Sequence, residues 1–184
     1  MLHKNVFGLA IMLFFGCAPV ASPSISDQQE SLSLIDQGTL LLRQGEFDKA
    51  QAAFEVANEL APSGAALDGL GCVAFAAGDL DLAEEFFRAA YEYYPDYKNS
   101  IGNLAAVFAK KGNIPAATEA YLLAVRENPE NFRFRNNFAG HLVELNQEVY
   151  RSQAKNELWK AGALTKHPLV LSNMELEIWD NQKN

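Results

Sequence analysis

A proline recurs at the end of three successive segments of this chain, and its spacing constrains the fold more than any other feature. Pro62, Pro95 and Pro129 lie 33 and 34 residues apart, and equivalent positions ahead of each proline carry similar residues. In each segment, apolar residues are spaced three and four apart on both sides of a glycine turn, which predicts a pair of amphipathic helices. One such hairpin cannot bury its own apolar face, so the copies are expected to stack.

Small and aromatic residues recur within the hairpins where two helices would approach each other. Small residues permit a close approach, and an aromatic ring fills the seam between the helices. In the third hairpin, Gly112 supplies the turn, Asn113 can cap the second helix and Pro115 falls in its first turn. The packing positions are Gly38, Gly71 and Ala105 on the first helices, Ala50, Ala83 and Ala117 on the second helices, and Phe54, Phe87 and Tyr121 in the seam.

A fourth unit begins at Phe132 and departs from the pattern. Asn146-Gln147 replaces the turn glycine, and Arg151 and Leu158 occupy the small positions of its longer second helix. Terminal repeats are expected to be atypical because they close the stack.

The two ends of the repeated region carry possible helix start signals. Ser26 with Gln29 has the form of a capping box, which predicts that the first helix begins near Asp27. Ser172 with Glu175 has the same form and predicts a short final helix. We expect this final helix to cover the last apolar face.

The whole pattern resembles the tetratricopeptide repeat, a 34-residue helix-turn-helix with small residues at two packing points and a closing proline. The family's usual tryptophan is replaced by leucine or isoleucine. The resemblance implies an all-α fold: a right-handed solenoid of helical hairpins with three regular repeats, one atypical fourth repeat and a C-terminal capping helix. The expected repeats lie at about residues 31–63, 64–97, 98–131 and 132–168, with the cap at 172–180, in a domain spanning 26–184.

Residues 1–16 have the features of a secretory signal peptide. Lys4 precedes an apolar run from Val6 to Phe15 that is too short for a comfortable membrane span. Gly16 directly before Cys17 resembles the lipobox of bacterial lipoproteins, in which the cysteine becomes the diacylated N-terminus.

This resemblance implies that residues 17–25, which are small and proline-bearing, form a lipidated tether. In the lipoprotein family, an alanine after the cysteine, here Ala18, favours transfer to the outer membrane. Three alternatives stay open: an ordinary secretory signal cut near Ala18 or Ala21, an uncleaved anchor, or an unprocessed N-terminal helix.

The composition excludes some classes of function. The net charge of −8 argues against nucleic-acid binding, because phosphate contacts need a basic surface. Residues 17–97 carry fourteen Asp/Glu and three Lys/Arg, whereas residues 98–184 carry nine and eleven. The acidic half is interpreted either as solvated helix faces or as a surface that steers a basic partner.

The sequence contains no recognisable catalytic or metal-binding constellation. Its three histidines and two cysteines lack H-E-x-x-H or C-x-x-C spacing. The Gly69-Leu70-Gly71 segment fits a loose dinucleotide fingerprint but lies inside a helical repeat, and Cys72 beside it is interpreted as a small buried residue. We therefore expect no cofactor, no metal and no enzymatic activity.

In tetratricopeptide proteins the first helices line a concave groove, and certain repeat positions face it. On this chain those positions hold small residues, including Gly69 and Gly102, together with amide and basic side chains. Asn103 and Asn137 occupy the same position in successive repeats, which resembles the asparagine ladder that holds a peptide backbone in some family members. An amide offers a donor and an acceptor to a peptide, and an arginine can bind a carboxylate, although the asparagines could instead be solvated or bond neighbouring helices. The predicted peptide-binding residues are Asn99, Asn103, Arg133, Asn136 and Asn137.

These features together predict a membrane-anchored adaptor that holds a protein or peptide in its groove, in the bacterial cell envelope, at the outer membrane facing the periplasm. The most specific hypothesis is a resemblance to tetratricopeptide lipoproteins that help pilus or secretion systems assemble. Two alternatives are a scaffold that recruits cell-wall hydrolases and a soluble periplasmic accessory protein that forms homo-oligomers.

Overall fold

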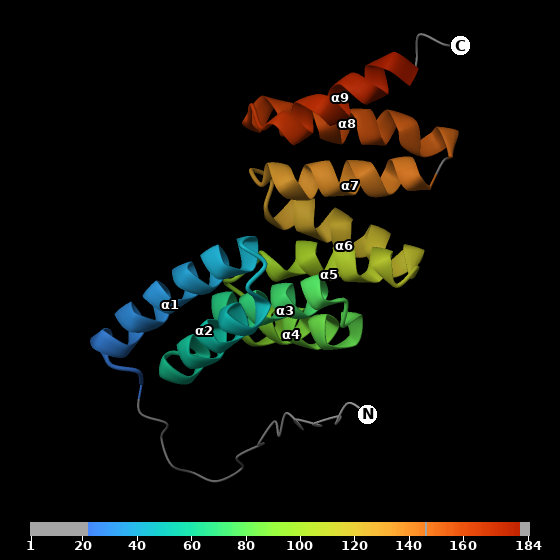
Figure 1. Cartoon of the computed structure of the whole chain (residues 1–184). Helices are drawn as coiled ribbons and strands as arrows, with labels where there is room; N and C mark the ends of the chain where they lie inside the picture. The colour runs from blue at the N-terminus through green and yellow to red at the C-terminus, as the bar shows by residue number, and fades with distance from the viewer. Residues whose placement is uncertain (1–21, 146, 181–184) are drawn as a thin grey trace.

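The computed structural model describes residues 22–145 and 147–180, and the side chains of those up to residue 175. Over these residues it contains nine α-helices and no strand, stacked as hairpins into a curved solenoid (Figure 1). The helices are α1 Ile25–Arg43, α2 Phe47–Leu60, α3 Gly64–Ala77, α4 Leu80–Tyr93, α5 Ser100–Lys110, α6 Ile114–Glu127, α7 Phe132–Glu144, α8 Glu148–Leu164 and α9 Pro168–Asp180.

The predicted all-α solenoid of three regular hairpins, an atypical fourth hairpin and a capping helix is confirmed. The hairpins are α1 with α2, α3 with α4, α5 with α6 and α7 with α8, and α9 packs against α8. The predicted signal peptide at 1–16, Cys17 and the first part of the tether lie outside the described residues. In the described part of the chain, none of the helices has the length and apolar character needed to span a membrane.

The three regular turns share one backbone conformation. Gly45, Gly78 and Gly112 have φ of 78°, 84° and 74°, a left-handed conformation that glycine adopts without steric cost. In each turn, the amide of the residue after the glycine donates to a carbonyl five residues earlier, at 2.9–3.0 Å. This pattern is the Schellman motif, which satisfies the free carbonyls at a helix end.

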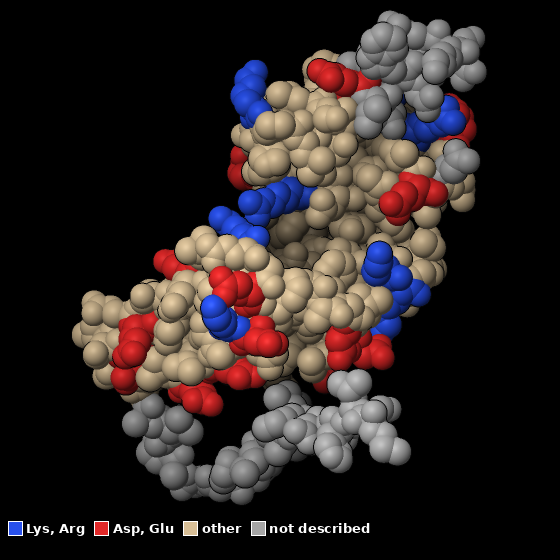
Figure 2. All heavy atoms as spheres, viewed as in Figure 1, with Lys and Arg blue, Asp and Glu red and all other residues tan. Residues whose placement is uncertain are grey.

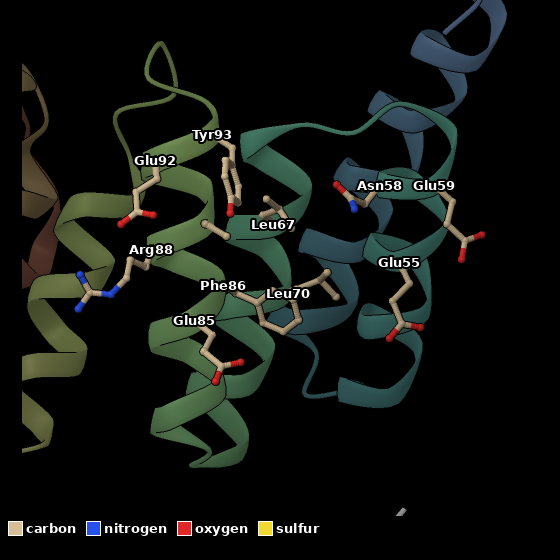
Figure 3. Close-up of a pocket in the computed structure, with 11 residues that line it drawn as sticks. Glu55, Asn58, Glu59, Leu67, Leu70, Glu85, Phe86, Arg88, Glu92 and Tyr93 are labelled. Atoms are coloured by element: carbon tan, nitrogen blue, oxygen red, sulfur yellow. The ribbon is translucent and has the colours of Figure 1, made fainter. Parts of the chain in front are cut away.

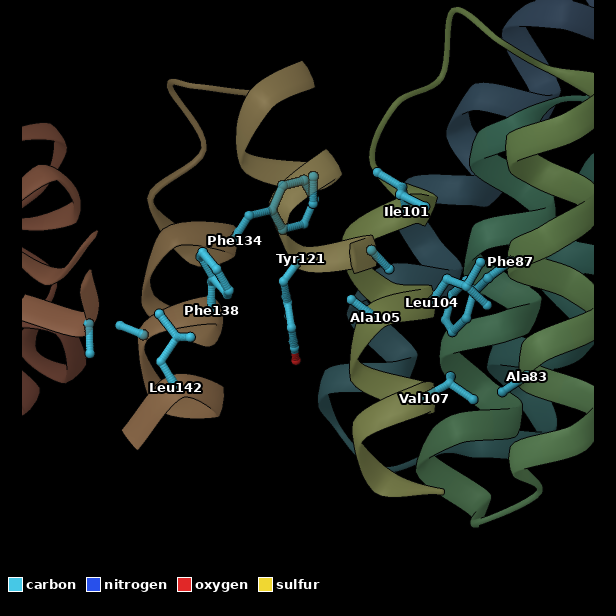
Figure 4. Packing of buried hydrophobic residues seen from close by; sticks show 14 of the residues in the cluster. Ala83, Phe87, Ile101, Leu104, Ala105, Val107, Tyr121, Phe134, Phe138 and Leu142 are labelled. Carbon is cyan, nitrogen blue, oxygen red and sulfur yellow. The ribbon is translucent and has the colours of Figure 1, made fainter. Parts of the chain in front are cut away.

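Aromatic rings against small residues fix the distance between helices, as predicted. Phe54 and Phe87 are almost completely buried, and Tyr121 is 5% exposed. A Cβ atom placed on Gly71 would lie 2.6 Å from the ring of Phe87, closer than real Cβ contacts occur. Tyr121 stacks on Phe138 of the next hairpin, with ring centroids 6.0 Å apart, so the core continues from one repeat to the next (Figure 4).

The fourth hairpin is held partly by an ion pair in place of an apolar contact. Arg135 occupies the position that Leu34, Leu67 and Ile101 fill in the first three repeats. Its Nη1 donates to Oε2 of Glu157 on α8 at 2.5 Å, and both side chains are largely buried. Lys160 also donates to Glu157, at 2.7 Å, so the buried carboxylate has two cationic partners.

Both predicted capping boxes are wrong in position. Helix α1 is capped by Ser24, whose Oγ accepts from the amide of Asp27 at 3.1 Å, so Ser26 lies inside the helix. Helix α9 begins at Pro168, whose fixed φ and missing amide hydrogen suit a first helical position, and Ser172 lies within it. The cap is therefore longer than the predicted 172–180.

The packing of Gly71 leads to a first prediction. We expect Gly71→Ala to lower the free energy of unfolding by about 1–3 kcal/mol, because the new methyl group overlaps the ring of Phe87. Gly140→Ala is the matched control: a Cβ there meets nothing within 4 Å, so the gain in helix propensity should stabilise the protein by about 0.5–1 kcal/mol. Urea unfolding of both variants measures the difference, and an equal response would contradict the close approach at Gly71.

Candidate functional site

Helices α1, α3, α5 and α7, the first helices of the four hairpins, form one continuous face, which we call the first-helix face. Each of these helices contacts the next one along the stack. Figure 2 shows a hollow on this side of the molecule, beside the end of α1 and below α7, with basic side chains at its edge. The predicted peptide-binding residues all belong to α5 and α7 or directly precede α5.

Asn103 on α5 is engaged with a neighbouring first helix. Its Nδ2 donates to both carboxylate oxygens of Asp68 on α3, at 3.0 and 3.1 Å. The hydroxyl of Tyr97 donates to Asp68 Oδ2 at 3.2 Å. Asn103 therefore makes the inter-helix bond that the sequence left open as an alternative, and its Oδ1 has no hydrogen-bond partner among the described residues.

Asp68 is the principal residue of this face that sequence reasoning missed. It is 8% exposed, and burial raises its pKa to about 6, against the lowering effect of the hydrogen bonds from Asn103 and Tyr97. Burial, followed by the negative charge of Asp68, raises the pKa of the nearby Cys72 thiol to about 12. Cys72 thus stays a thiol at neutral pH, which agrees with its interpretation as a small packing residue.

An acidic residue at a position where the other repeats have Ile35, Gly102 and Asn136 is the one sequence signal that could have singled out Asp68. Spacing alone does not identify its partners, because Asn103 and Tyr97 lie 35 and 29 residues away.

Asn136 differs from the expectation of an open groove residue. It is 7% exposed, and its Oδ1 accepts from Nδ2 of Asn173 on α9 at 2.8 Å. The capping helix therefore uses this amide oxygen to dock on the fourth repeat. This hydrogen bond places Asn173 of α9 beside α7, where it helps to bury Asn136.

Two glycines that were expected to floor the groove instead mark contacts between repeats. A Cβ on Gly69 would lie 2.3 Å from the ring of Phe54, and one on Gly102 would lie 2.3 Å from the ring of Phe134. Neighbouring aromatic rings fill the space beside these two glycines, so the glycines leave no room for a ligand.

Three of the predicted residues remain exposed on the surface: Asn99, Arg133 and Asn137. Asn99 precedes α5 without capping it through its side chain. The guanidinium of Arg133 lies over the ring of Phe132, 5.9 Å from its centroid, which restricts where its charge can be presented. A hollow of about 620 Å³, lined by residues 127–133, adjoins this arginine.

The described residues contain no group of three His, Cys, Asp or Glu that could hold a metal ion. His141 is buried beside Tyr121, and its Nε2 lies 2.8 Å from Oγ1 of Thr118. Burial lowers the pKa of His141, which favours the neutral imidazole. Its contacts are those of a residue that packs in the core.

A solenoid of helical hairpins with a polar, partly hollowed face defines a class of protein that binds other proteins or peptides. Family models described as "Tetratricopeptide repeat" match residues 35–98 and 74–136. The chain belongs to the tetratricopeptide repeat family. Proteins of this family are typically non-enzymatic scaffolds, and the fold supports a role as a protein-interaction adaptor or scaffold.

Solved structures with the same fold share little sequence with this chain, and no curated protein sequence matches it significantly. The pilF protein of Pseudomonas aeruginosa is 20% identical, with a TM-score of 0.73 over 86% of this chain and 72% of that one. The protein TTC0263 of Thermus thermophilus is 21% identical, with a TM-score of 0.70 over 82% of each chain. The first TPR domain of Spaghetti (RPAP3), solved with an HSP90 peptide, is 18% identical, with a TM-score of 0.57 over 65% of this chain and 96% of that one.

Burial of Asp68 leads to a second prediction. Its pKa is 3.8 in an unfolded chain and about 6 here, so between these pH values the folded protein binds more protons than the unfolded one. The free energy of unfolding contributed by Asp68 should therefore fall as pH rises through this window, by of order 1 kcal/mol per pH unit.

The isosteric variant Asp68→Asn lacks this titration and is the matched comparison. Urea unfolding of both proteins at several pH values between 4 and 7 measures the difference in stability. We expect the free energy of unfolding of the variant to rise relative to that of the wild type as pH rises. A constant difference between the two proteins over this pH range would contradict a raised pKa at Asp68.

Proposed function

We propose that this protein is a membrane-anchored adaptor that holds a protein or peptide segment on its first-helix face during assembly of a cell-envelope complex, such as a pilus or secretion system. The observation that carries the proposal is the presence of exposed Arg133 and Asn137 on α7, next to the repeat that presents Asn103. The Oδ1 atom of Asn103 has no hydrogen-bond partner in the part of the chain that the structure describes. Together these groups offer donors, an acceptor and a cation to an extended chain.

Two similarities support a peptide ligand and an envelope role. The related TPR domain of RPAP3 was solved bound to the HSP90 peptide SRMEEVD, a chain with acidic residues near its end. Basic Arg133 suits such a carboxylate, whereas buried Asp68 does not. The pilF protein shares the fold over most of this chain, and this likeness accords with the pilus hypothesis derived from the sequence.

Membrane attachment rests on the N-terminal sequence. Cys17 after an apolar segment is the proposed lipidation site, and Ala18 favours the outer membrane, with the repeats facing the periplasm. Two or more acyl chains give stable anchoring, whereas a single chain binds a membrane only marginally.

The groove is tested with Arg133→Ala and Asn137→Ala, which remove exposed side chains and leave the core intact. Loss of a hydrogen bond to a charged group costs about 1.5–3 kcal/mol, so we expect Arg133→Ala to weaken binding of a carboxylate-bearing partner about tenfold or more. Asn103→Ala is avoided because it would also leave buried Asp68 without its amide donor.

The binding partner is captured by photo-crosslinking in intact cells. A crosslinking amino acid is placed at Asn137 or, as a control, at the exposed Asn156 on α8. A discrete product from position 137 that is lost with Arg133→Ala supports the proposal. Equal products from both positions, or a product unaffected by Arg133→Ala, would remove the first-helix face from the proposed function.

Lipidation is tested by metabolic labelling with palmitate. We expect Cys17→Ala to abolish the label and release the protein from membranes, while Cys72→Ala, which removes the only other cysteine, keeps both. A label that persists in Cys17→Ala would contradict the proposed anchor.

A further inference from the structure

A second hollow lies between α2 and α4, on the side of the stack formed by the second helices (Figure 3). Its volume is about 790 Å³. Helices α2 and α4 both pack against α3, but they are not packed against each other. Side chains of α3 are therefore left at the bottom of a groove, which we call the α2–α4 groove.

The floor of the α2–α4 groove is apolar. Leu70 from α3 and Phe86 from α4 face each other there, with Leu67 and Tyr93 above them in the view of Figure 3. Tyr93 is 64% exposed, although an aromatic ring of this size is normally covered. Apolar side chains at the bottom of a groove, with an exposed tyrosine at its edge, are typical of a surface that binds another protein.

The edges of the groove are acidic. Glu55 and Glu59 lie one turn apart on α2, and Glu85 and Glu92 lie on α4. Among the residues that the structure describes, none of these four glutamates forms a salt bridge; Glu55 accepts only from the amide of Gln51. The groove therefore presents uncompensated negative charge on both sides of an apolar floor.

Arg88, the one basic residue among the described residues that line the groove, does not neutralise these edges. Its Nη2 donates to Glu84 at 2.7 Å, and its guanidinium lies 5.8 Å from the centroid of the Phe108 ring. Figure 3 shows the side chain directed away from Leu70 and Phe86.

The pair of glutamates on α2 is particular to the first repeat and is not a general property of exposed second helices. Glu55 and Glu59 are both acidic, whereas neither of the next two repeats has acidic residues at both positions. The equivalent residues are Arg88 and Glu92 in the second repeat, and Leu122 and Arg126 in the third.

We propose that the α2–α4 groove binds an amphipathic helix of a partner protein, with Lys or Arg residues flanking its apolar stripe. The apolar stripe would cover Leu70, Phe86 and Tyr93, and the basic residues would pair with the glutamates on both edges. The lining residues of α4 span Glu85–Tyr93, so the groove is about 13 Å long and matches about two to three helical turns. This site is separate from the first-helix face and does not depend on the function proposed for it.

Binding is measured with the full-length chain immobilised through a C-terminal tag. The probe is an 18-residue helical peptide with leucine on one face and lysine on the other, and a leucine/glutamate peptide of the same pattern is its control. We expect the double variant Glu55→Lys, Glu59→Lys to weaken binding of the lysine peptide at least about tenfold, because like charges now meet at one edge.

The matched control variant is Glu30→Lys, Asp36→Lys, which changes the net charge equally on exposed positions of α1. Its effect on the lysine peptide should be below about twofold, since these residues lie outside the groove. Tyr93→Ser, an exposed substitution that leaves the core unchanged, should weaken binding without altering charge.

Equal weakening by the two charge-reversal variants would mean that binding reflects net charge alone, and it would overturn the proposal. The same conclusion follows if the lysine peptide binds no better than the glutamate peptide, or if Tyr93→Ser has no effect. Sedimentation velocity tests whether the groove instead binds a second copy of this chain. Self-association that disappears in Glu55→Lys, Glu59→Lys would assign the groove to that second copy and would overturn the proposal as well.

Discussion

Contact between an aromatic ring and the bare backbone of a glycine sets the geometry of this solenoid. The ring of Phe54 lies between Gly38 of its own hairpin and Gly69 of the next, where an added Cβ would come within 3.0 and 2.3 Å of it. One side chain therefore fixes the spacing within a hairpin and between hairpins. Because a solenoid repeat contacts only its neighbours, this local spacing determines the curvature of the stack and the shape of both of its faces.

The same spacing explains why a carboxylate is buried on the first-helix face. Helices α3 and α5 approach closely enough for Asn103 to reach both oxygens of Asp68, and Tyr97 from the preceding loop closes the cluster. A buried polar group of this kind is tolerated when its partners are in place, and it then holds them rigidly. The amide of Asn103 is thereby fixed with its nitrogen toward Asp68, which leaves only its oxygen for a ligand.

Periodicity was sufficient to predict the helices, the turn glycines and the aromatic seam, because each depends on residues close together in sequence. Helix starts were harder: Ser24 with Asp27 and Ser26 with Gln29 fit the same capping signature, and only the folded backbone selects the first. The binding residues were harder still to predict, because whether an asparagine side chain is free to bind a ligand depends on partners that are distant in sequence. Asn136 is occupied by Asn173, 37 residues away, a contact that no local pattern indicates.

The charge division along the chain acquires a structural meaning from the two faces. Near the middle of the stack, Lys111 donates to Asp81 and Glu84 at 2.6 and 2.8 Å, so the charge of this lysine is balanced by two carboxylates of α4. The glutamates that line the α2–α4 groove lie on α2 and α4, in the acidic half of the chain, whereas exposed Arg133 lies on α7, in the other half. If both proposed sites are correct, their opposite charges select different ligands on separate surfaces, and a single chain could hold two partners together without competition between them.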